Sequence, residues 1–276
     1  MKVLLLNGSS HPNGTTMAAI KEMEKVFHAE NVETEVIQVG GKPIADCLQC
    51  NVCQKTGKCV FKDDGVNDFV EKAKSADGFV FATPVYFAHP SGRIYDFLDR
   101  AFYSAGSDEV YDAFKFKPGA AVAVARRGGT TAALDGLNKY FGIAQMPVAG
   151  STYWNMVHGL HGEEAPQDEE GMQTMRNLAR NMVWMMKCFA LGKKECLILR
   201  QRQKRVRILS GGKITRDNRV GGVLGCDKTS FKTRIRRQKN AGSNQKQKKY
   251  PKIQKRTGFQ RADQRDPACR NAGAVF

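Results

Sequence analysis

The 276-residue chain has no long apolar run. No segment approaches the roughly 18 apolar residues that a membrane-spanning helix needs. The apolar run near the N-terminus covers only residues 3–6, which is too short for the core of a signal peptide. We therefore expect a cytoplasmic protein with no membrane partner. We also expect its eight cysteines to be free thiols or metal ligands rather than a secreted disulfide framework.

Charge and apolar residues are unevenly distributed along the chain. Residues 1–195 hold 21 Lys and Arg against 23 Asp and Glu, a net charge of −2, whereas residues 196–276 hold 23 against 4, a net charge of +19. The second region contains no Met, and residues 229–276 contain no Leu. Such a segment cannot bury enough apolar surface to offset the entropy lost on ordering. We therefore predict a folded domain over residues 1–195 and a disordered basic tail over residues 196–276.

The basic tail has two competing explanations. Its Lys- and Arg-rich runs, at residues 234–237 and 246–249, are suited to nucleic-acid phosphates. Aromatic residues that would stack on bases are scarce there, however. The joint loss of Met, Leu and acidic residues after the last predicted helix is typical of translation past a frameshift. We favour a non-functional extension, so nucleic acid is not an expected partner.

Strand-like and helical patterns alternate through the first region. The expected strands cover residues 2–6, 32–39, 78–82, 120–125 and 147–149. The expected helices cover residues 16–28, 65–76, 92–103, 131–141 and 168–191. Gly192 is expected to end the last helix, whose methionines we place in the core or at a subunit interface. Alternation at this spacing predicts an α/β fold with a doubly wound, parallel, five-stranded sheet.

Four cysteines lie within thirteen residues, in the spacing C-x2-C-x2-C-x5-C: Cys47, Cys50, Cys53 and Cys59. A thiolate at every third position lets one short loop wrap three corners of a compact cluster, and the fourth sulfur closes the cage. Structural zinc more often uses two separated cysteine pairs, so the compressed spacing favours an iron–sulfur cluster over zinc. A cysteine-rich turn with free or partly buried thiols is the simpler alternative.

The turn after the first predicted strand, residues 8–16, is a candidate phosphate loop. It joins the carboxyl end of a strand to the next helix, where backbone N–H groups and the helix dipole favour an anion. Hydrogen-bonding side chains there are Ser9, Ser10, Asn13, Thr15 and Thr16. The Lys of a P-loop and the spacing of the dinucleotide fingerprint are both missing, so neither ATP nor a Rossmann-bound dinucleotide is favoured. An ordinary capped helix start is the alternative.

Two further loops follow predicted strands at the same sheet edge. Residues 83–87 place Tyr86 and Phe87 on a turn stiffened by Pro84, and residues 126–130 offer glycine amides and positive charge. A flat, electron-rich ring system needs an aromatic wall and backbone donors at its polar edge. Core packing is the alternative for the two aromatic rings, and three suitable loops on one edge disfavour it.

Taken together, these motifs resemble the flavodoxin-like NAD(P)H-dependent FMN reductases, and among them the iron–sulfur flavoproteins. The resemblance covers residues 1–195 and includes Asp63-Asp64, Asp99-Arg100 and residues 168–171. It implies FMN, whose phosphate would lie on the candidate phosphate loop and whose ring would lie against the other two loops. The candidate cofactor residues are Ser9, Ser10, His11, Asn13, Thr15, Thr16, Pro84, Val85, Tyr86, Phe87, Arg127, Gly128 and Gly129.

The resemblance also implies a [4Fe–4S] cluster on the four cysteines. It implies a homodimer or homotetramer in which cluster and flavin approach across subunits, with NAD(P)H or a reduced carrier such as ferredoxin as electron donor. No side chain is assigned as a general acid or base, because the flavin carries the chemistry. One alternative is a cluster-free NAD(P)H-dependent reductase of flavin, quinone or azo compounds. Another is a flavin-free protein that uses its basic tail on nucleic acid.

Overall fold

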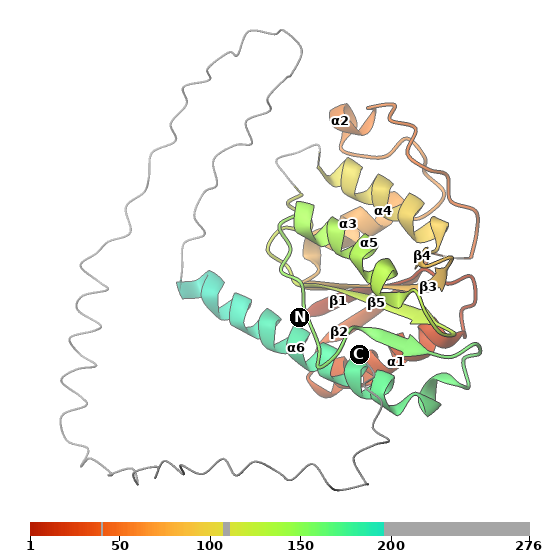
Figure 1. Cartoon of the computed structure of the whole chain (residues 1–276). Helices are drawn as coiled ribbons and strands as arrows, with labels where there is room; N and C mark the ends of the chain where they lie inside the picture. Colours follow the sequence, from red (N-terminus) through yellow and green to blue (C-terminus); the bar gives the residue numbers. More distant parts are fainter. Residues whose placement is uncertain (40, 107–110, 196–276) are drawn as a thin grey trace, which may run out of the picture. The chain divides into compact units, whose positions relative to one another are not determined.

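The computed structural model describes residues 1–39, 41–106 and 111–195, in which strands and helices alternate as expected (Figure 1). The predicted basic tail lies outside these residues, so its disorder and the domain boundary at residue 195 stay predictions. In the described ranges, no helix is both long enough and apolar enough to cross a membrane.

Five parallel strands form the sheet, in the order β2-β1-β3-β5-β6. They are β1 (Lys2–Asn7), β2 (Glu33–Gln38), β3 (Gly78–Tyr86), β5 (Gly119–Ala125) and β6 (Met156–His158). This is the flavodoxin strand order. A two-residue strand, β4 (His89–Pro90), runs antiparallel to the end of β3. The predicted doubly wound, five-stranded sheet is therefore confirmed, with β4 as an addition.

The pairing register brings the loops of interest to one edge of the sheet. Asn7 at the end of β1 is level with Ala82 of β3, and Pro84 of β3 is level with Val124 of β5. Because parallel strands share a direction, the loops that follow β1, β3 and β5 all leave the same edge.

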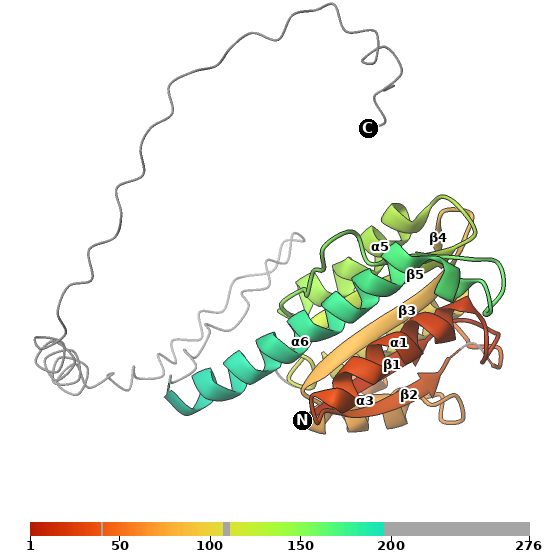
Figure 2. The ribbon, with the colours of Figure 1, turned by 90° about the horizontal axis from the view of Figure 1, so that it is seen from below.

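Helices cover both faces of the sheet (Figures 1 and 2). On one face lie α3 (Val66–Ser75), α4 (Gly92–Ala105) and α5 (Thr130–Ile143). On the other lie α1 (Thr15–Ala29) and α6 (Glu169–Glu195). Both faces are buried, which explains why the central strands are continuously apolar rather than alternating.

The two cores differ in composition. The α3–α4–α5 side is built around phenylalanines, and the Phe102 and Phe114 rings stack with their centres 4.3 Å apart. The α1–α6 side is built around methionines, so the stripe on α6 packs mainly into the core. The buried methionines on that side are Met23, Met172, Met175, Met182 and Met186.

Three predicted boundaries are wrong. The strand predicted over residues 78–82 is β3 and continues to Tyr86. The fifth strand is not at residues 147–149, where Val148 makes only an isolated bridge to Gly119. It is β6, a three-residue strand in which only Val157 is fully buried, so its apolar pattern is too short to be recognised. The helix α6 also does not end at Gly192 but continues to Glu195. A glycine inside a helix weakens it by only about 1 kcal/mol, which its neighbours offset.

Candidate functional site

The candidate phosphate loop begins at a buried asparagine. Asn7 accepts a hydrogen bond from the Ser9 N–H at 3.1 Å and donates from Nδ2 to Gln38 Oε1 at 2.8 Å. The Gln38 amide in turn donates to the Ser9 carbonyl. The His11 N–H donates to Ser9 Oγ at 3.1 Å. These bonds fold the first half of the loop against β1 and β2.

The loop leads directly into the open end of α1. Gly14 is the N-cap residue, and among the described residues no side chain caps this helix. The first N–H groups of a helix have no partner within it and carry partial positive charge, so an anion is stabilised there. Three loop residues are buried at this point, namely Ser9, Thr15 and Thr16. Three are exposed, namely Ser10, His11 and Asn13.

The aromatic segment predicted as a turn at residues 83–87 is the end of β3 followed by a tight hairpin. β3 runs through Tyr86, which pairs with His89 of β4. Phe87 and Ala88 make the turn, with φ angles of 49° and 63°. The Tyr86 side chain is 46% exposed and that of Phe87 is 99% exposed, so core packing accounts for neither ring.

The hairpin is tied to the candidate phosphate loop through a serine. The Ser91 N–H donates to Thr83 Oγ1 at 3.0 Å, and Ser91 Oγ donates to the Gly8 carbonyl at 2.9 Å. Pro84 and Val85 are half-buried in the strand between these contacts and the aromatic rings. Both loops are therefore held in a fixed relation to each other.

The glycine-rich loop after β5 lies against this hairpin. Gly129 has a φ angle of 92°, and a Cβ added to it would lie 2.7 Å from Ala88 Cα and 3.0 Å from Val85 Cγ1. Only glycine meets both conditions without strain. Arg127 and Gly128 are exposed beside it. The loop therefore offers backbone donors and positive charge next to the exposed aromatic rings.

A fourth loop, residues 159–164, which the sequence analysis did not assign to the site, contacts the end of the candidate phosphate loop. Thr15 Oγ1 lies 3.5 Å from the Gly159 carbonyl. A Cβ added to Gly162 would lie 2.4 Å from the carbonyl oxygen of Asn13. This close approach places two stretches of backbone in direct contact at the entrance to α1.

His158 joins this fourth loop to the glycine-rich loop. The His158 ring Nε2 lies 2.9 Å from the Arg127 carbonyl, and the His158 backbone N–H donates to Asp168 Oδ2 at 2.7 Å. The Gly171 N–H donates to Asp168 Oδ1 at 2.9 Å, so the same carboxylate begins α6. The loop at residues 159–164 follows β6. Because the fifth strand was predicted at residues 147–149, this loop was not predicted to be at the site.

The four cysteines line a single hollow, together with Arg100 and Tyr103 of α4. Cys50 is exposed, Cys47 and Cys59 are half-buried, and Cys53 is buried at the start of the short helix α2 (Cys53–Thr56). In the described ranges, no group of three or more Cys, His, Asp or Glu side chains is arranged to hold a metal ion.

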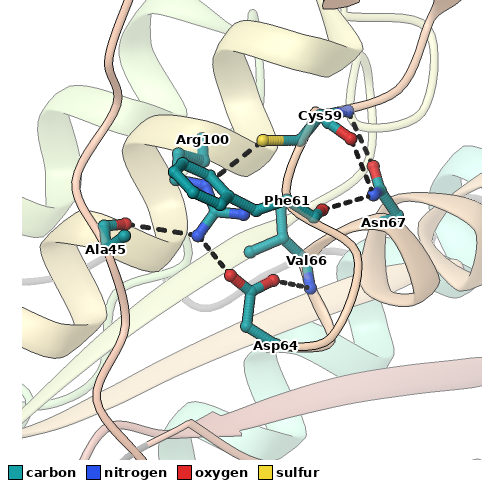
Figure 3. Close-up of polar contacts among 7 residues, drawn as sticks. All are labelled: Ala45, Cys59, Phe61, Asp64, Val66, Asn67 and Arg100. Atoms are coloured by element: carbon teal, nitrogen blue, oxygen red, sulfur yellow. Dashed lines mark hydrogen bonds and ion pairs between the residues drawn. The ribbon is translucent and has the colours of Figure 1, made fainter.

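An asparagine on α3 fixes the last cysteine (Figure 3). The Cys59 N–H donates to Asn67 Oδ1 at 2.8 Å, and Asn67 Nδ2 donates to the carbonyls of Cys59 and Phe61 at 3.0 and 2.9 Å. The amide thus satisfies three backbone groups of the cysteine loop. The sequence alone gave no signal for this role.

Arg100 contacts the same cysteine from α4. Its Nε donates to Cys59 Sγ at 3.2 Å and its Nη1 pairs with Asp64. Burial alone would lower the pKa of Arg100, but the hydrogen bonds to Asp64 and Cys59 outweigh it, so the pKa is raised. Burial also raises the pKa of the Cys53 thiol, and negative charge at Cys59 adds to that effect.

Comparison with known proteins identifies the family. The model of the NADPH-dependent FMN reductase family matches residues 1–161, more than half of the chain. The chain belongs to this family. An iron–sulfur flavoprotein of Methanocaldococcus jannaschii is 32% identical over 196 residues, which cover 68% of this chain and 98% of that protein. An iron–sulfur flavoprotein of Archaeoglobus fulgidus is 31% identical over 192 residues, 66% of this chain and 95% of that protein.

A solved structure supports the fold assignment. RosB with bound 8-demethyl-8-formylriboflavin-5′-phosphate superposes with a TM-score of 0.54 at 16% identity, over 82% of this chain and all of that one. At this identity the likeness concerns the fold alone. Membership of the family makes the chain a flavin-dependent oxidoreductase, and its curated relatives place it in the iron–sulfur flavoprotein branch.

Proposed function

We propose that this chain binds FMN at the loop edge of its sheet, carries a [4Fe–4S] cluster on its four clustered cysteines, and transfers electrons between a donor and an acceptor. Three features lie at one edge of the sheet: the start of α1, which no described side chain caps, the exposed aromatic hairpin and the glycine-rich loop. This arrangement carries the proposal. A flavin mononucleotide has a phosphate for the first and a flat ring for the others.

The proposed FMN site has two parts at the loop edge of the sheet, one for the phosphate and one for the ring. The phosphate would lie at the start of α1, where Ser9, Thr15 and Thr16 supply hydroxyls beside helix N–H groups that no described side chain caps. The ring would lie between the β3–β4 hairpin and the Gly128–Gly129 backbone. When bound, FMN takes up a hydride or two electrons and releases them one or two at a time. The protein binds and orients it, and no side chain need move a proton.

The cysteine hollow fits a cluster better than a single zinc ion. In a [4Fe–4S] cluster each cysteine ligates a different iron, so the four sulfurs stand farther apart than around one tetrahedral ion. All four cysteines line one hollow, and their compressed C-x2-C-x2-C-x5-C spacing favours a cluster over zinc. Arg100 supplies positive charge beside Cys59, as a thiolate requires.

The electron donor and the assembly follow from the family relationship. We expect NAD(P)H or a reduced carrier such as ferredoxin to supply electrons, and a homodimer or homotetramer in which the cluster of one subunit approaches the flavin of another. The second candidate function is a cluster-free NAD(P)H-dependent reductase. It is favoured by the match of residues 1–161 to the NADPH-dependent FMN reductase family, whose description names FMN and no cluster.

Anaerobic purification followed by assay of FMN, iron and sulfide tests both cofactors. We expect about one FMN and about four irons per subunit. Cys50→Ser should lose iron and keep FMN, because the two sites use separate loops. Cys188→Ser is the matched control, since Cys188 is an exposed thiol on α6, outside the cysteine loop, and it should keep both cofactors.

The possible failures are distinct. Protein with FMN but no iron under strict anaerobiosis supports the cluster-free reductase. Zinc in place of iron contradicts the cluster, and protein without FMN contradicts the placement of the flavin site. Loss of both cofactors from Cys50→Ser alone would point to a folding defect in that variant.

A further inference from the structure

Arg100 is a buried charge beside the cysteine hollow. Its side chain is only 1% exposed, although it lies on α4 among the apolar residues Phe97 and Ala101. Burying a charge is unfavourable unless its partners compensate fully. The partners of Arg100 therefore indicate what this position does.

The guanidinium holds three separate points of the cysteine segment (Figure 3). Nη1 pairs with Asp64 and donates to the Ala45 carbonyl at 3.2 Å, while Nε donates to Cys59 Sγ at 3.2 Å. The face of the guanidinium lies 4.6 Å from the centre of the Phe61 ring. These contacts fix the orientation of the fork relative to the Cys59 sulfur.

One terminal nitrogen of the fork has no acceptor in the described part of the chain. Nη2 is buried and has no hydrogen-bond partner among the residues that the structure describes. A buried donor without a partner is unfavourable, and such atoms are rare in folded proteins. Arg100 also lines the hollow that the four cysteines share. The free donor is therefore available to an acceptor that fills this hollow.

The contact with Cys59 is more than is needed to neutralise the guanidinium. Asp64 alone balances its charge, so the Nε bond to sulfur is an additional interaction. A thiol sulfur is a weak acceptor, whereas a thiolate accepts a strong charge-assisted bond. The geometry is therefore suited to a Cys59 sulfur that carries negative charge.

We propose that Arg100 is a positioning residue that raises the reduction potential of the cluster through its N–H donors, with Nε on the Cys59 sulfur and Nη2 on a second sulfur acceptor in the hollow. This inference rests on the proposed cluster. Reduction adds one negative charge to a cluster, and N–H bonds to its sulfurs stabilise the more negative form. Removing those donors while keeping the net charge should therefore make the cluster harder to reduce.

The test measures the midpoint potential of the anaerobic holoprotein by spectroelectrochemical titration, together with iron and FMN content. Arg100→Lys keeps the positive charge and loses the fork. Arg100→Met combined with Asp64→Asn keeps the net charge of the pair and removes every guanidinium donor. Arg176→Lys is the control, because this arginine pairs with Glu22 on the far side of the sheet. The control should match wild type in potential.

We expect both Arg100 variants to retain iron and to shift the reduction equilibrium at least tenfold toward the oxidised cluster, about 59 mV for a one-electron couple. A wild-type potential in both variants would overturn the inference. Loss of iron from Arg100→Lys would also overturn it, since Arg100 would then only hold the loop together. Absence of iron from the wild-type protein would instead mean that the proposed function has failed.

Discussion

Lys117 shows how the environment of a single residue alters its charge. Its ammonium lies at the end of α3, where it donates to the carbonyls of Ala73 and Lys74 at 2.6 and 3.0 Å. Burial, with a smaller contribution from Lys193, lowers its pKa from 10.5 to about 8. The unfolded chain therefore binds more protons than the folded protein between pH 8 and about 10.5, so the free energy of unfolding should rise with pH across that window.

Lys117→Met should remove this pH dependence. The wild-type free energy of unfolding, measured by urea titration, should gain roughly 1–2 kcal/mol between pH 8 and pH 10.5 relative to the variant, after allowance for solvent screening. Lys115→Met is the control, because Lys115 lies two positions away and is half-buried. Equal slopes in wild type and Lys117→Met would contradict the prediction.

A second prediction at the residue scale concerns the phosphate. Thr16→Asp places a carboxylate in the first turn of α1. There it repels a phosphate, but its interaction with the helix dipole is favourable. We expect the variant to fold and to lose FMN, with binding weakened by about 2–5 kcal/mol. Thr131→Asp, in the first turn of α5, tests the same substitution at another helix start and should retain FMN. Stoichiometric FMN in Thr16→Asp would show that the phosphate lies elsewhere.

The contacts of single residues mark the limit of sequence analysis. Ser9, Thr15 and Thr16 were predicted as a group because strand ends and helix starts are recognisable locally. Asn67 was not assigned to the cysteine site. Arg100 was noted only within the Asp99-Arg100 pair, without a role beside the cysteines. Arg100 is 41 positions from Cys59, and no local pattern pairs an α4 side chain with a sulfur so far away.

At the scale of elements, the glycine-rich loop and the hairpin form one unit. Gly129→Ala should destabilise the protein by about 1–3 kcal/mol, because alanine is strained at a φ angle of 92° and its Cβ meets the hairpin backbone. Gly128→Ala is the matched control, since a Cβ there meets nothing within 4 Å. Thermal unfolding of the FMN-free proteins should separate the two variants. Equal melting temperatures would mean that the loop relaxes away from Ala88.

The same scale shows why the fold was easier to predict than the site. Long buried strands and amphipathic helices have periodic patterns, so β1, β3, β5 and all five long helices were placed within a few residues. β6 has three residues and one buried side chain, Val157, which is too little to form a pattern. The fourth loop of the site depends on β6, so a single missed strand removed His158 and Gly162 from the prediction.

At the scale of the whole molecule, the chain combines a nearly neutral region with a strongly basic one. Residues 1–195 have a net charge of −2 and residues 196–276 one of +19. Every candidate loop and every described strand and helix lies in the first region. If the cofactor sites depend only on these elements, removing the second region should leave them intact.

Truncation after Glu195 tests this separation. We expect FMN content, iron content and reductase rate to stay within about twofold of the full chain. A twofold change corresponds to a much smaller free-energy difference than the roughly 1.4 kcal/mol of a tenfold change. Retention on heparin or DNA should be lost, because only the second region carries enough Lys and Arg to neutralise many phosphates or sulfates. In the full chain that retention should fall steeply as salt increases, since it depends on the release of counterions. A truncated protein that cannot hold FMN would place the domain boundary beyond residue 195. Equal retention of both proteins on DNA would instead assign nucleic-acid binding to the flavin domain, against its negative net charge.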